Sequence, residues 1–270
     1  MNSDCAFRMG RSHSVCQDYA VAGGGERPYV IVADGCSSSP DTDIGARLLA
    51  RLAERSLRSG AAELGLERVV RRAGKLATHL GLNACCLDAT LLTARVRGEQ
   101  WQVRVAGDGL VAWQDRDGWI HVRVISYGAG YPEYPSYLAC PERRRSFEAL
   151  DGNHATLLRI TLEPDGRAVS LPDEMLSPSG YQESGSVRDA VWVALLSDGA
   201  ASFVAQNAAE DRSCGSASVA VATVLGELLR FKSMQGVFVQ RRLARFSQQC
   251  ATRGWCHQDD LALGAIYLGA

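Results

Sequence analysis

Three aspartates stand directly after apolar stretches that have the length and composition of buried β-strands. Asp34 follows YVIVA, Asp108 follows VRVAG and Asp198 follows VWVALLS, and each is followed by a glycine. A carboxylate taken out of water needs a cation, a hydrogen-bond donor or a route to solvent. The Asp-Gly pairs that follow polar segments are instead typical of exposed turns; they begin at Asp117, Asp151 and Asp165.

Two further acidic positions stand where apolar strands begin. Asp18 opens DYAVA, and Asp259-Asp260 precede LALGAIYL. If the five strand ends meet at one rim of a sheet, their carboxylates repel one another, and their pKa values rise unless cations neutralise them. A set of oxygen ligands without histidine or cysteine suits Mg²⁺ or Mn²⁺, and Zn²⁺ less readily. The pattern therefore predicts a site for divalent metal ions.

The cysteines indicate neither a zinc site nor a cysteine nucleophile. The chain has nine cysteines and no Cys-x-x-Cys pair, which is typical of buried thiols in a reducing cytosol. Cys250, Cys256 and His257 lack a fourth ligand at the spacing of a zinc finger. The one Cys-x5-Arg match, from Cys5 to Arg11, follows no strand, and we interpret Cys36 as a bystander beside the metal site.

The elements that must position these aspartates come in groups of strands separated by long helices. Helices are expected over about 41–60, over 61–82 and over 216–250, with strands between and after them. Residues from about 127 to 186 are rich in Pro, Gly and Tyr and are interpreted as an irregular insertion that contains one clear strand, ATLLRITL. Grouped strands with helices between them favour an α+β fold over a doubly wound sheet.

Length and charge narrow the classes of function. The chain has 270 residues, 46% of them apolar, which suits one sizeable domain over residues 1–270. Its net charge of -1 provides no electrostatic footprint for nucleic acid or for an anionic membrane. No apolar run is long enough to cross a bilayer and no signal-peptide pattern opens the chain, so we expect a cytoplasmic protein.

The order of the motifs resembles the PP2C-type metal-dependent protein serine/threonine phosphatases. These motifs are Cys16-Gln17-Asp18, VADG, a DAT strand, GDG, SDG and a terminal Asp-Asp pair. The opening Gly10-Arg11-Ser12-His13 is similar to that of the compact bacterial branch of the family. The resemblance runs from about Gly10 to about Leu268, and six motifs in the family's order make it fairly specific.

The resemblance implies a four-layer α-β-β-α sandwich, in which two central antiparallel sheets are flanked by helices, with two Mn²⁺ or Mg²⁺ ions at one end. Carried over by position, Asp34 bridges both ions together with the carbonyl of Gly35. Asp198 and Asp259 each hold one ion, and Asp18 supports the site. Asp108, together with Asp198, would serve a third, weaker metal site. Asp260 is the alternative to Asp259, although the family's Asp-Asn pair points to Asp259.

The activity implied by the resemblance is hydrolysis of phosphoserine and phosphothreonine in proteins by a metal-activated water. Paired cations lower the pKa of water and bind phosphoryl oxygens, so that positioning and charge stabilisation replace a protein nucleophile. The expected partners are a phosphorylated protein substrate and a cognate serine/threonine kinase of a bacterial signalling pathway.

The sequence departs from the family pattern at several positions. The usual glycine pair is Ser37-Ser38, the serine of the Gly-Asp-Ser motif is Gly109, and the phosphate-binding arginine has no clear counterpart. His13 occupies the spacing of that arginine and is a candidate general acid or a structural histidine. Arg11, close by, is the candidate phosphate ligand or a surface arginine.

Two rival hypotheses remain open at this point. One is a catalytically weak PP2C-like module that binds a phosphoprotein or a signalling partner. The other is an unrelated carboxylate metallohydrolase. Histidine ligands are expected in the second case, and the five histidines of the chain do not cluster at the strand ends.

Overall fold

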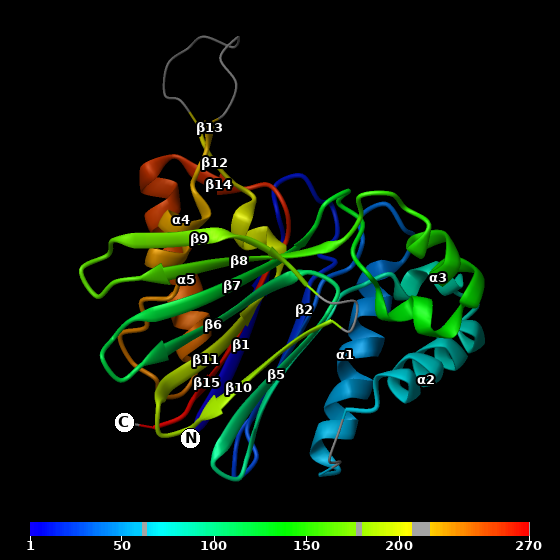
Figure 1. Cartoon of the computed structure of the whole chain (residues 1–270), viewed down its shortest axis with the longest axis horizontal. Helices are drawn as coiled ribbons and strands as arrows, with labels where there is room; N and C mark the ends of the chain where they lie inside the picture. Colours follow the sequence, from blue (N-terminus) through cyan, green and yellow to red (C-terminus); the bar gives the residue numbers. More distant parts are fainter. Residues whose placement is uncertain (61–63, 177–179, 207–216, 270) are drawn as a thin grey trace.

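Two antiparallel sheets lie face to face, and helices cover the outer surface of each (Figure 1). The computed structural model describes residues 1–60, 64–176, 180–206 and 217–269. The layers follow the order helix, sheet, sheet, helix, so the predicted α+β sandwich is confirmed. Within the described residues, no helix is long and apolar enough to cross a membrane.

The first sheet has five strands in the order β10-β5-β4-β3-β2. Its strands are β2 (Tyr19–Gly23), β3 (Tyr29–Ala33), β4 (Leu91–Arg97), β5 (Gln100–Ala106) and β10 (Tyr181–Ser186). The helices α1 (Thr42–Arg58) and α2 (Leu66–His79) pack against β3, which is buried along its whole length, and a short 3-10 helix, η1 (Ala84–Leu87), leads into β4. The predicted second helix thus begins at Leu66, and residues 61–63 lie outside the described part of the chain.

The second sheet has seven strands in the order β1-β15-β11-β6-β7-β8-β9. Its strands are β1 (Asn2–Arg8), β6 (Gly109–Asp115), β7 (Ile120–Tyr127), β8 (Ala155–Leu162), β9 (Ala168–Met175), β11 (Ala190–Leu196) and β15 (Leu261–Tyr267). The helices α4 (Val221–Leu228) and α5 (Phe238–Arg253) cover its outer face. These two helices, and not one continuous helix, occupy the region expected to be helical over 216–250.

A small third sheet and three short helices complete the fold. The small sheet has the order β13-β12-β14, with β12 at Phe203–Ala205, β13 at Ala217–Ser218 and β14 at Trp255–His257. The helix η3 (Asp198–Ala201) follows β11, while η2 (Pro135–Ala139) and α3 (Pro141–Glu148) lie between β7 and β8. Residues 155–186, expected to belong to the irregular insertion, contribute β8, β9 and β10 to the two sheets.

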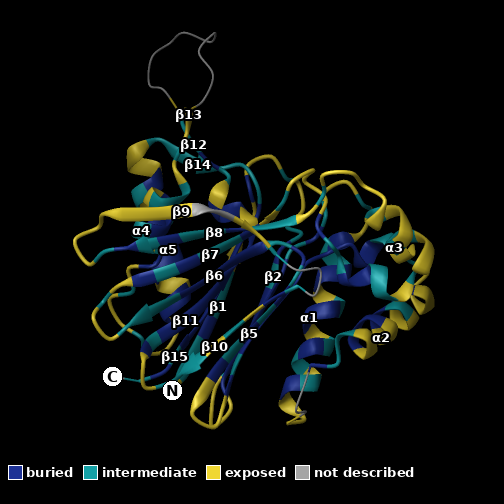
Figure 2. Ribbon diagram, viewed as in Figure 1, coloured by how far each residue is buried: buried dark blue, intermediate teal, exposed yellow. Residues whose placement is uncertain are grey.

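Alternating apolar side chains hold the layers together, because successive residues of a strand point to opposite faces of a sheet. Val30 and Val32 of β3 face Val193 and Ile266 across the interior between the sheets. Ile31, between them in sequence, faces α1 and α2. Most strands and the inner faces of the helices are accordingly buried, while the outer helix faces and the edge strand β9 are exposed (Figure 2).

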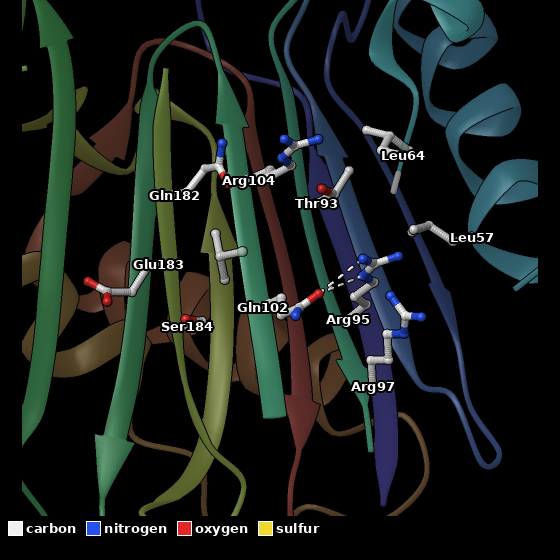
Figure 3. Close-up of a pocket in the computed structure, with 11 residues that line it drawn as sticks. Leu57, Leu64, Thr93, Arg95, Arg97, Gln102, Arg104, Gln182, Glu183 and Ser184 are labelled. Carbon is white, nitrogen blue, oxygen red and sulfur yellow. Dashed lines mark hydrogen bonds between the residues drawn. The ribbon is translucent and has the colours of Figure 1, made fainter. Parts of the chain in front are cut away.

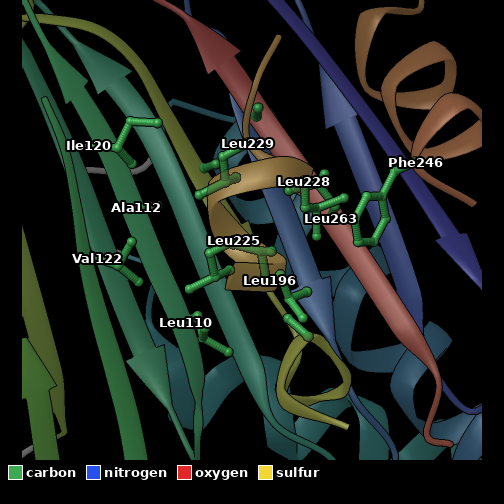
Figure 4. Close-up of a cluster of buried hydrophobic side chains, with 14 of the residues drawn as sticks. Leu110, Ala112, Ile120, Val122, Leu196, Leu225, Leu228, Leu229, Phe246 and Leu263 are labelled. Atoms are coloured by element: carbon green, nitrogen blue, oxygen red, sulfur yellow. The ribbon is translucent and has the colours of Figure 1, made fainter. Parts of the chain in front are cut away.

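The other helical layer closes on the seven-stranded sheet through leucines and aromatic rings. Leu225 and Leu228 of α4 and Phe246 of α5 pack on Leu110, Leu196 and Leu263 (Figure 4). Leu196 is the last residue of β11, so this packing also fixes the end of the strand that carries Asp198.

The first turn of α5 is capped by a side chain from the other end of the chain. The buried carboxylate of Asp4 accepts hydrogen bonds from the backbone N–H groups of Val239 (2.7 Å) and Gln240 (3.1 Å). A carboxylate at this place satisfies donors that the helix leaves unpaired and also interacts favourably with the helix dipole.

We expect the substitution Asp4→Ala to lower the free energy of unfolding by about 2 kcal/mol, because two buried donors lose a charged acceptor. Asp4→Asn should lose less, since its amide oxygen still accepts one hydrogen bond. Urea denaturation monitored by circular dichroism measures both changes. An Asp4→Ala protein as stable as the unsubstituted chain would contradict this role for Asp4.

Candidate active site

Five segments bring carboxylates to one end of the two sheets. Strand pairing places Tyr19, where β2 begins, opposite Ala33, where β3 ends. The backbone N–H of Thr90, just before β4, donates to the carbonyl of Asp34 over 2.8 Å. In the other sheet, Leu196 at the end of β11 pairs with Leu110 and Leu263, near the starts of β6 and β15. The predicted convergence of the aspartates follows from this register.

The carboxylates are close enough to raise one another's pKa. Burial, followed by the charges of Asp18 and Asp198, raises the pKa of Asp34 well above its ordinary value. Burial and then Asp198 raise the pKa of Asp108 to about 7. Burial and Asp198 also raise the pKa of Asp259. Asp198, itself exposed, therefore lies within electrostatic reach of each of these three groups.

Asp18 is the most enclosed member of the cluster. Its side chain is 0% exposed, and its Oδ2 accepts a hydrogen bond of 2.6 Å from the hydroxyl of Ser197. Its Oδ1 is buried and has no hydrogen-bond partner among the described residues. Burial raises the pKa of Asp18, the bond from Ser197 opposes this rise, and the charge of Asp198 adds to it. A buried carboxylate oxygen without a donor is costly unless a cation approaches it.

The donor set therefore fits hard divalent cations. Carboxylate oxygens predominate, one buried oxygen lacks a donor, and the pKa shifts show repulsion that bound cations would relieve. Among the described residues, no group of three or more His, Cys, Asp or Glu side chains forms a compact metal-binding cluster.

Asp259 and Asp260 have different surroundings. The carboxylate of Asp260, which is 0% exposed, accepts hydrogen bonds from the backbone N–H groups of Gly10 (2.7 Å) and Gln17 (2.6 Å). These bonds tie Asp260 to the segment before β2. The side chain of Asp259 is 43% exposed and faces the other aspartates, which makes it the better placed of the two for a metal ion.

Three glycines at the site are required by close approach of the backbone. A Cβ atom on Gly10 would lie 2.3 Å from the carbonyl carbon of Asp259, and one on Gly199 would lie 1.7 Å from the carbonyl oxygen of Asp260. Gly35, whose carbonyl is the predicted metal ligand, forms an isolated β-bridge with Ala89. A Cβ atom on Gly35 would lie 2.9 Å from the side chain of Thr42. At these three glycines the backbone segments that carry the aspartates lie so close to neighbouring segments that there is no room for a side chain.

His13 lies between the two terminal aspartates. Its Nδ1 is 3.0 Å from Asp260 Oδ2 and its Nε2 is 3.4 Å from Asp259 Oδ1, with 16% of the side chain exposed. Burial lowers the pKa of His13, but the two carboxylates outweigh burial and raise it. The protonated form of the His13 ring is thus favoured. Both predicted roles of His13, as a structural residue in an ion pair and as a general acid, require this form.

Arg11 is exposed and lies away from the carboxylates. Its Nη1 contacts Cys256 Sγ at 3.8 Å, and within the described part of the chain no carboxylate forms an ion pair or hydrogen bond with its guanidinium. Its backbone is fixed beside the site, because Arg11 N–H donates to the carbonyl of His257 and Ser12 N–H to that of Gln258. Only a rotation of the side chain would bring Arg11 toward the metal ligands.

Sequence reasoning missed a buried ion pair that joins two parts of the site. Asp88, which is 2% exposed, accepts two hydrogen bonds from the guanidinium of Arg143, over 2.8 Å and 2.7 Å. It also accepts from the hydroxyls of Ser136 (2.7 Å) and Ser39 (2.9 Å). Ser39 lies in the loop after Asp34, whereas Ser136 and Arg143 lie in the segment between β7 and β8. The only signal in the sequence was a polar residue, Asp88, directly before a buried strand.

The sequence and the fold both resemble known proteins. The family profile described as protein phosphatase 2C matches residues 9–186. A structure of a bacterial serine phosphatase aligns over 100% of this chain and 99% of its own, with a TM-score of 0.55 and 11% sequence identity.

Two further solved structures share the fold at similarly low identity. A serine/threonine phosphatase of Staphylococcus aureus has a TM-score of 0.55 and 10% identity over 99% of this chain and 95% of its own. A serine/threonine phosphatase of S. agalactiae has a TM-score of 0.53 and 11% identity, with 98% of each chain covered. No curated protein is similar enough in sequence to match the chain.

The raised pKa of Asp108 predicts how the stability of the metal-free protein depends on pH. Between its ordinary pKa of 3.8 and about 7, Asp108 binds a proton in the folded state but not in the unfolded state. The free energy of unfolding therefore falls as the pH rises through this range. We expect Asp108→Asn to reduce that fall by about 1 to 3 kcal/mol.

Urea denaturation in the presence of a chelator, at pH 4.5 and at pH 7.5, measures this difference. Asp117→Asn is the matched control, because Asp117 lies in the exposed turn between β6 and β7. If the free energy of unfolding depends on pH equally in the two variants, the pKa of Asp108 is not raised by its surroundings.

Proposed function

The chain belongs to the protein phosphatase 2C family, and on this premise we propose that it hydrolyses phosphoserine and phosphothreonine in proteins with two divalent cations, Mn²⁺ or Mg²⁺. The observation that carries this proposal is a set of carboxylates at strand ends, where burial and neighbouring charge raise the pKa of Asp18, Asp34, Asp108 and Asp259. Such an arrangement is costly for a fold and is expected where cations bind.

In this proposal, Asp34 and the carbonyl of Gly35 hold both cations. Asp198 and Asp259 each hold one side, and Asp18, anchored by Ser197, supports the site with its unpartnered Oδ1. Asp108 would serve a third, weaker site together with Asp198. When bound, the cations supply activated water and stabilise the charge of the phosphoryl oxygens.

The remaining steps belong to side chains of the chain itself. His13, whose protonated form is favoured by Asp260 and Asp259, is placed to hold a proton for the alkoxide that leaves. Arg11 is proposed to bind the phosphoryl group after its side chain turns from Cys256. A guanidinium there would orient the phosphate through two parallel hydrogen bonds.

The cellular setting is part of the proposal. The eight cysteines in the described part of the chain are all free thiols, which supports a reducing, cytoplasmic compartment. We propose a cognate serine/threonine kinase as the source of the phosphorylated protein substrate in a bacterial signalling pathway.

A catalytically weak module that binds phosphoproteins is the second candidate. Ser37-Ser38 in place of the family's glycine pair and the orientation of Arg11 toward Cys256 favour it. The complete set of metal aspartates favours the enzyme. Turnover therefore separates the two candidates.

We expect the protein to hydrolyse p-nitrophenyl phosphate and a phosphothreonine peptide with Mn²⁺ or Mg²⁺, and to lose this activity with a chelator.

Asp34→Asn should lower turnover by about 100-fold or more, because a residue proposed to hold both cations loses its charge. Its metal-free form should be at least as stable as that of the parent chain, since repulsion in the cluster is relieved. Steady-state kinetics, calorimetric titration with Mn²⁺ and urea denaturation measure the three effects. Asp34→Asn protein with the parent's turnover and Mn²⁺ affinity would overturn the assignment.

Arg11→Ala should lower kcat/KM by about 10-fold or more, equivalent to about 1.4 kcal/mol of transition-state stabilisation. Arg11→Lys should restore only part of the loss, because an ammonium group lacks the planar fork of a guanidinium. His13→Ala should chiefly alter the pH profile. Arg8→Ala is the matched control, because Arg8 is also exposed and lies in the same cavity as Arg11. If Arg11→Ala and Arg8→Ala behave alike, Arg11 does not bind the phosphate.

A further inference from the structure

The outer face of the five-stranded sheet carries a cavity lined by arginines (Figure 3), and none of the strand-end aspartates lines it. It has a volume of about 460 Å³ and lies on β4, β5 and β10, bordered by Leu57 and Leu64. We call it the arginine groove; its polar lining includes Thr93, Arg95, Arg97, Gln102, Arg104 and Gln182.

Cross-strand pairing aligns the polar residues of the groove in rows. Arg104 lies opposite Thr93 on one side and opposite Gln182 on the other. Arg95 lies opposite Gln102, and its Nε and Nη2 donate to Gln102 Oε1 over 3.1 Å and 3.0 Å. The guanidinium of Arg95 is therefore held in a defined position on the floor of the groove.

Arg104 supplies a cation that the described part of the chain does not neutralise. Its side chain is half-buried, and no described residue forms an ion pair or a side-chain hydrogen bond with it. The one carboxylate among the described lining residues is Glu183, which accepts a hydrogen bond from Tyr181 Oη (2.7 Å) and lies 3.8 Å from Arg123. A partly desolvated guanidinium without a counter-ion favours binding of an anion.

The arginine groove continues toward the carboxylate cluster. A second cavity of about 300 Å³ shares Leu64, Arg104 and Gln182 with it and extends to Gly107, the residue before Asp108. Tyr134 also lines this second cavity. Burial and the hydrogen bond with Cys36 raise the pKa of Tyr134, and the charges of Asp108 and Asp34 add to the rise. Tyr134 thus connects the second cavity with the metal ligands.

We propose that the arginine groove binds an acidic stretch of the phosphorylated polypeptide whose phosphoryl group lies at the carboxylate cluster. This rests on the proposed function and adds a preference for acidic sequences. Arg104 stands two residues before the end of β5 and four before Asp108, so the two residues are at most about 13 Å apart, the length of about four residues of an extended peptide. Glutamate or aspartate about four positions from the phosphorylated residue would then reach Arg104 and Arg95.

Three phosphothreonine peptides test this preference. One carries glutamates three to five residues before the phosphothreonine, one carries them three to five residues after it, and one carries serines at both places. Arg104→Glu should lower kcat/KM for one of the acidic peptides by about 10-fold or more, the size expected for an arginine–carboxylate contact turned into repulsion. The serine peptide and p-nitrophenyl phosphate should change by less than about 2-fold. Arg104→Gln should give an intermediate loss.

Arg245→Glu is the matched control, because it makes the same change of charge at an exposed position on α5, in the other helical layer. It should leave the preference among the peptides unchanged. Equal kcat/KM values of the parent chain for acidic and serine peptides would overturn the proposal. So would an equal loss on every substrate in Arg104→Glu, which would indicate a purely structural role.

A binding measurement keeps this test separate from that of the proposed function. If the parent chain hydrolyses none of the esters, fluorescence anisotropy with a labelled acidic peptide that lacks phosphate still reports on the groove. Binding that Arg104→Glu weakens by about 10-fold or more, and that Arg245→Glu retains, would support the groove alone. No binding by the parent chain at low ionic strength would overturn it, because screening is weakest there.

Discussion

The mutual repulsion of carboxylates enclosed at one rim is the constraint on which the rest of the structure depends. Burial and neighbouring charge both act against the ionised forms of Asp18, Asp34 and Asp108. Backbone hydrogen bonds hold the groups together nevertheless, because each stands at the end of a strand whose register is set by its neighbours. Ser197 links two of these strand ends, because its hydroxyl donates a hydrogen bond to Asp18 and accepts one from the backbone N–H of Ala262 (2.8 Å). The fold thus stores an unfavourable interaction that cations are suited to relieve.

The buried pair of Asp88 and Arg143 connects this rim to the segment between β7 and β8. Removing Arg143 would leave the buried carboxylate of Asp88 without its counter-ion, so the pair helps to fix the position of the segment. The same segment carries Tyr134, which lies between the carboxylates and the cavity that leads to Arg104. The position of the segment beside the candidate active site therefore depends in part on this ion pair.

Membership of the protein phosphatase 2C family and sequence identities near 10% to similar structures show what this fold requires. Most of the sequence can differ while the two facing sheets are kept. The glycine pair and the serine of the Gly-Asp-Ser motif are replaced here by Ser37-Ser38 and Gly109 without loss of the architecture. The architecture therefore does not require the family's usual residues at these positions, and kinetics has to test the proposed activity.

The sequence by itself determined the strongly apolar strands and the placing of acidic residues at their ends, because the period of apolar residues and the residue that follows a buried run are local properties. It did not indicate β1, β9 and β10, whose residues are more polar. The tertiary structure decided which distant groups contact the residues at those strand ends. Asp260 is distinguished from Asp259 by backbone donors at Gly10 and Gln17, about 250 residues away in the chain. Arg143 reaches Asp88 across 55 residues, and β10 pairs with β5 to create the row that contains Arg104. Such pairings depend on which distant backbone groups meet, and no local pattern of residue types encodes that choice.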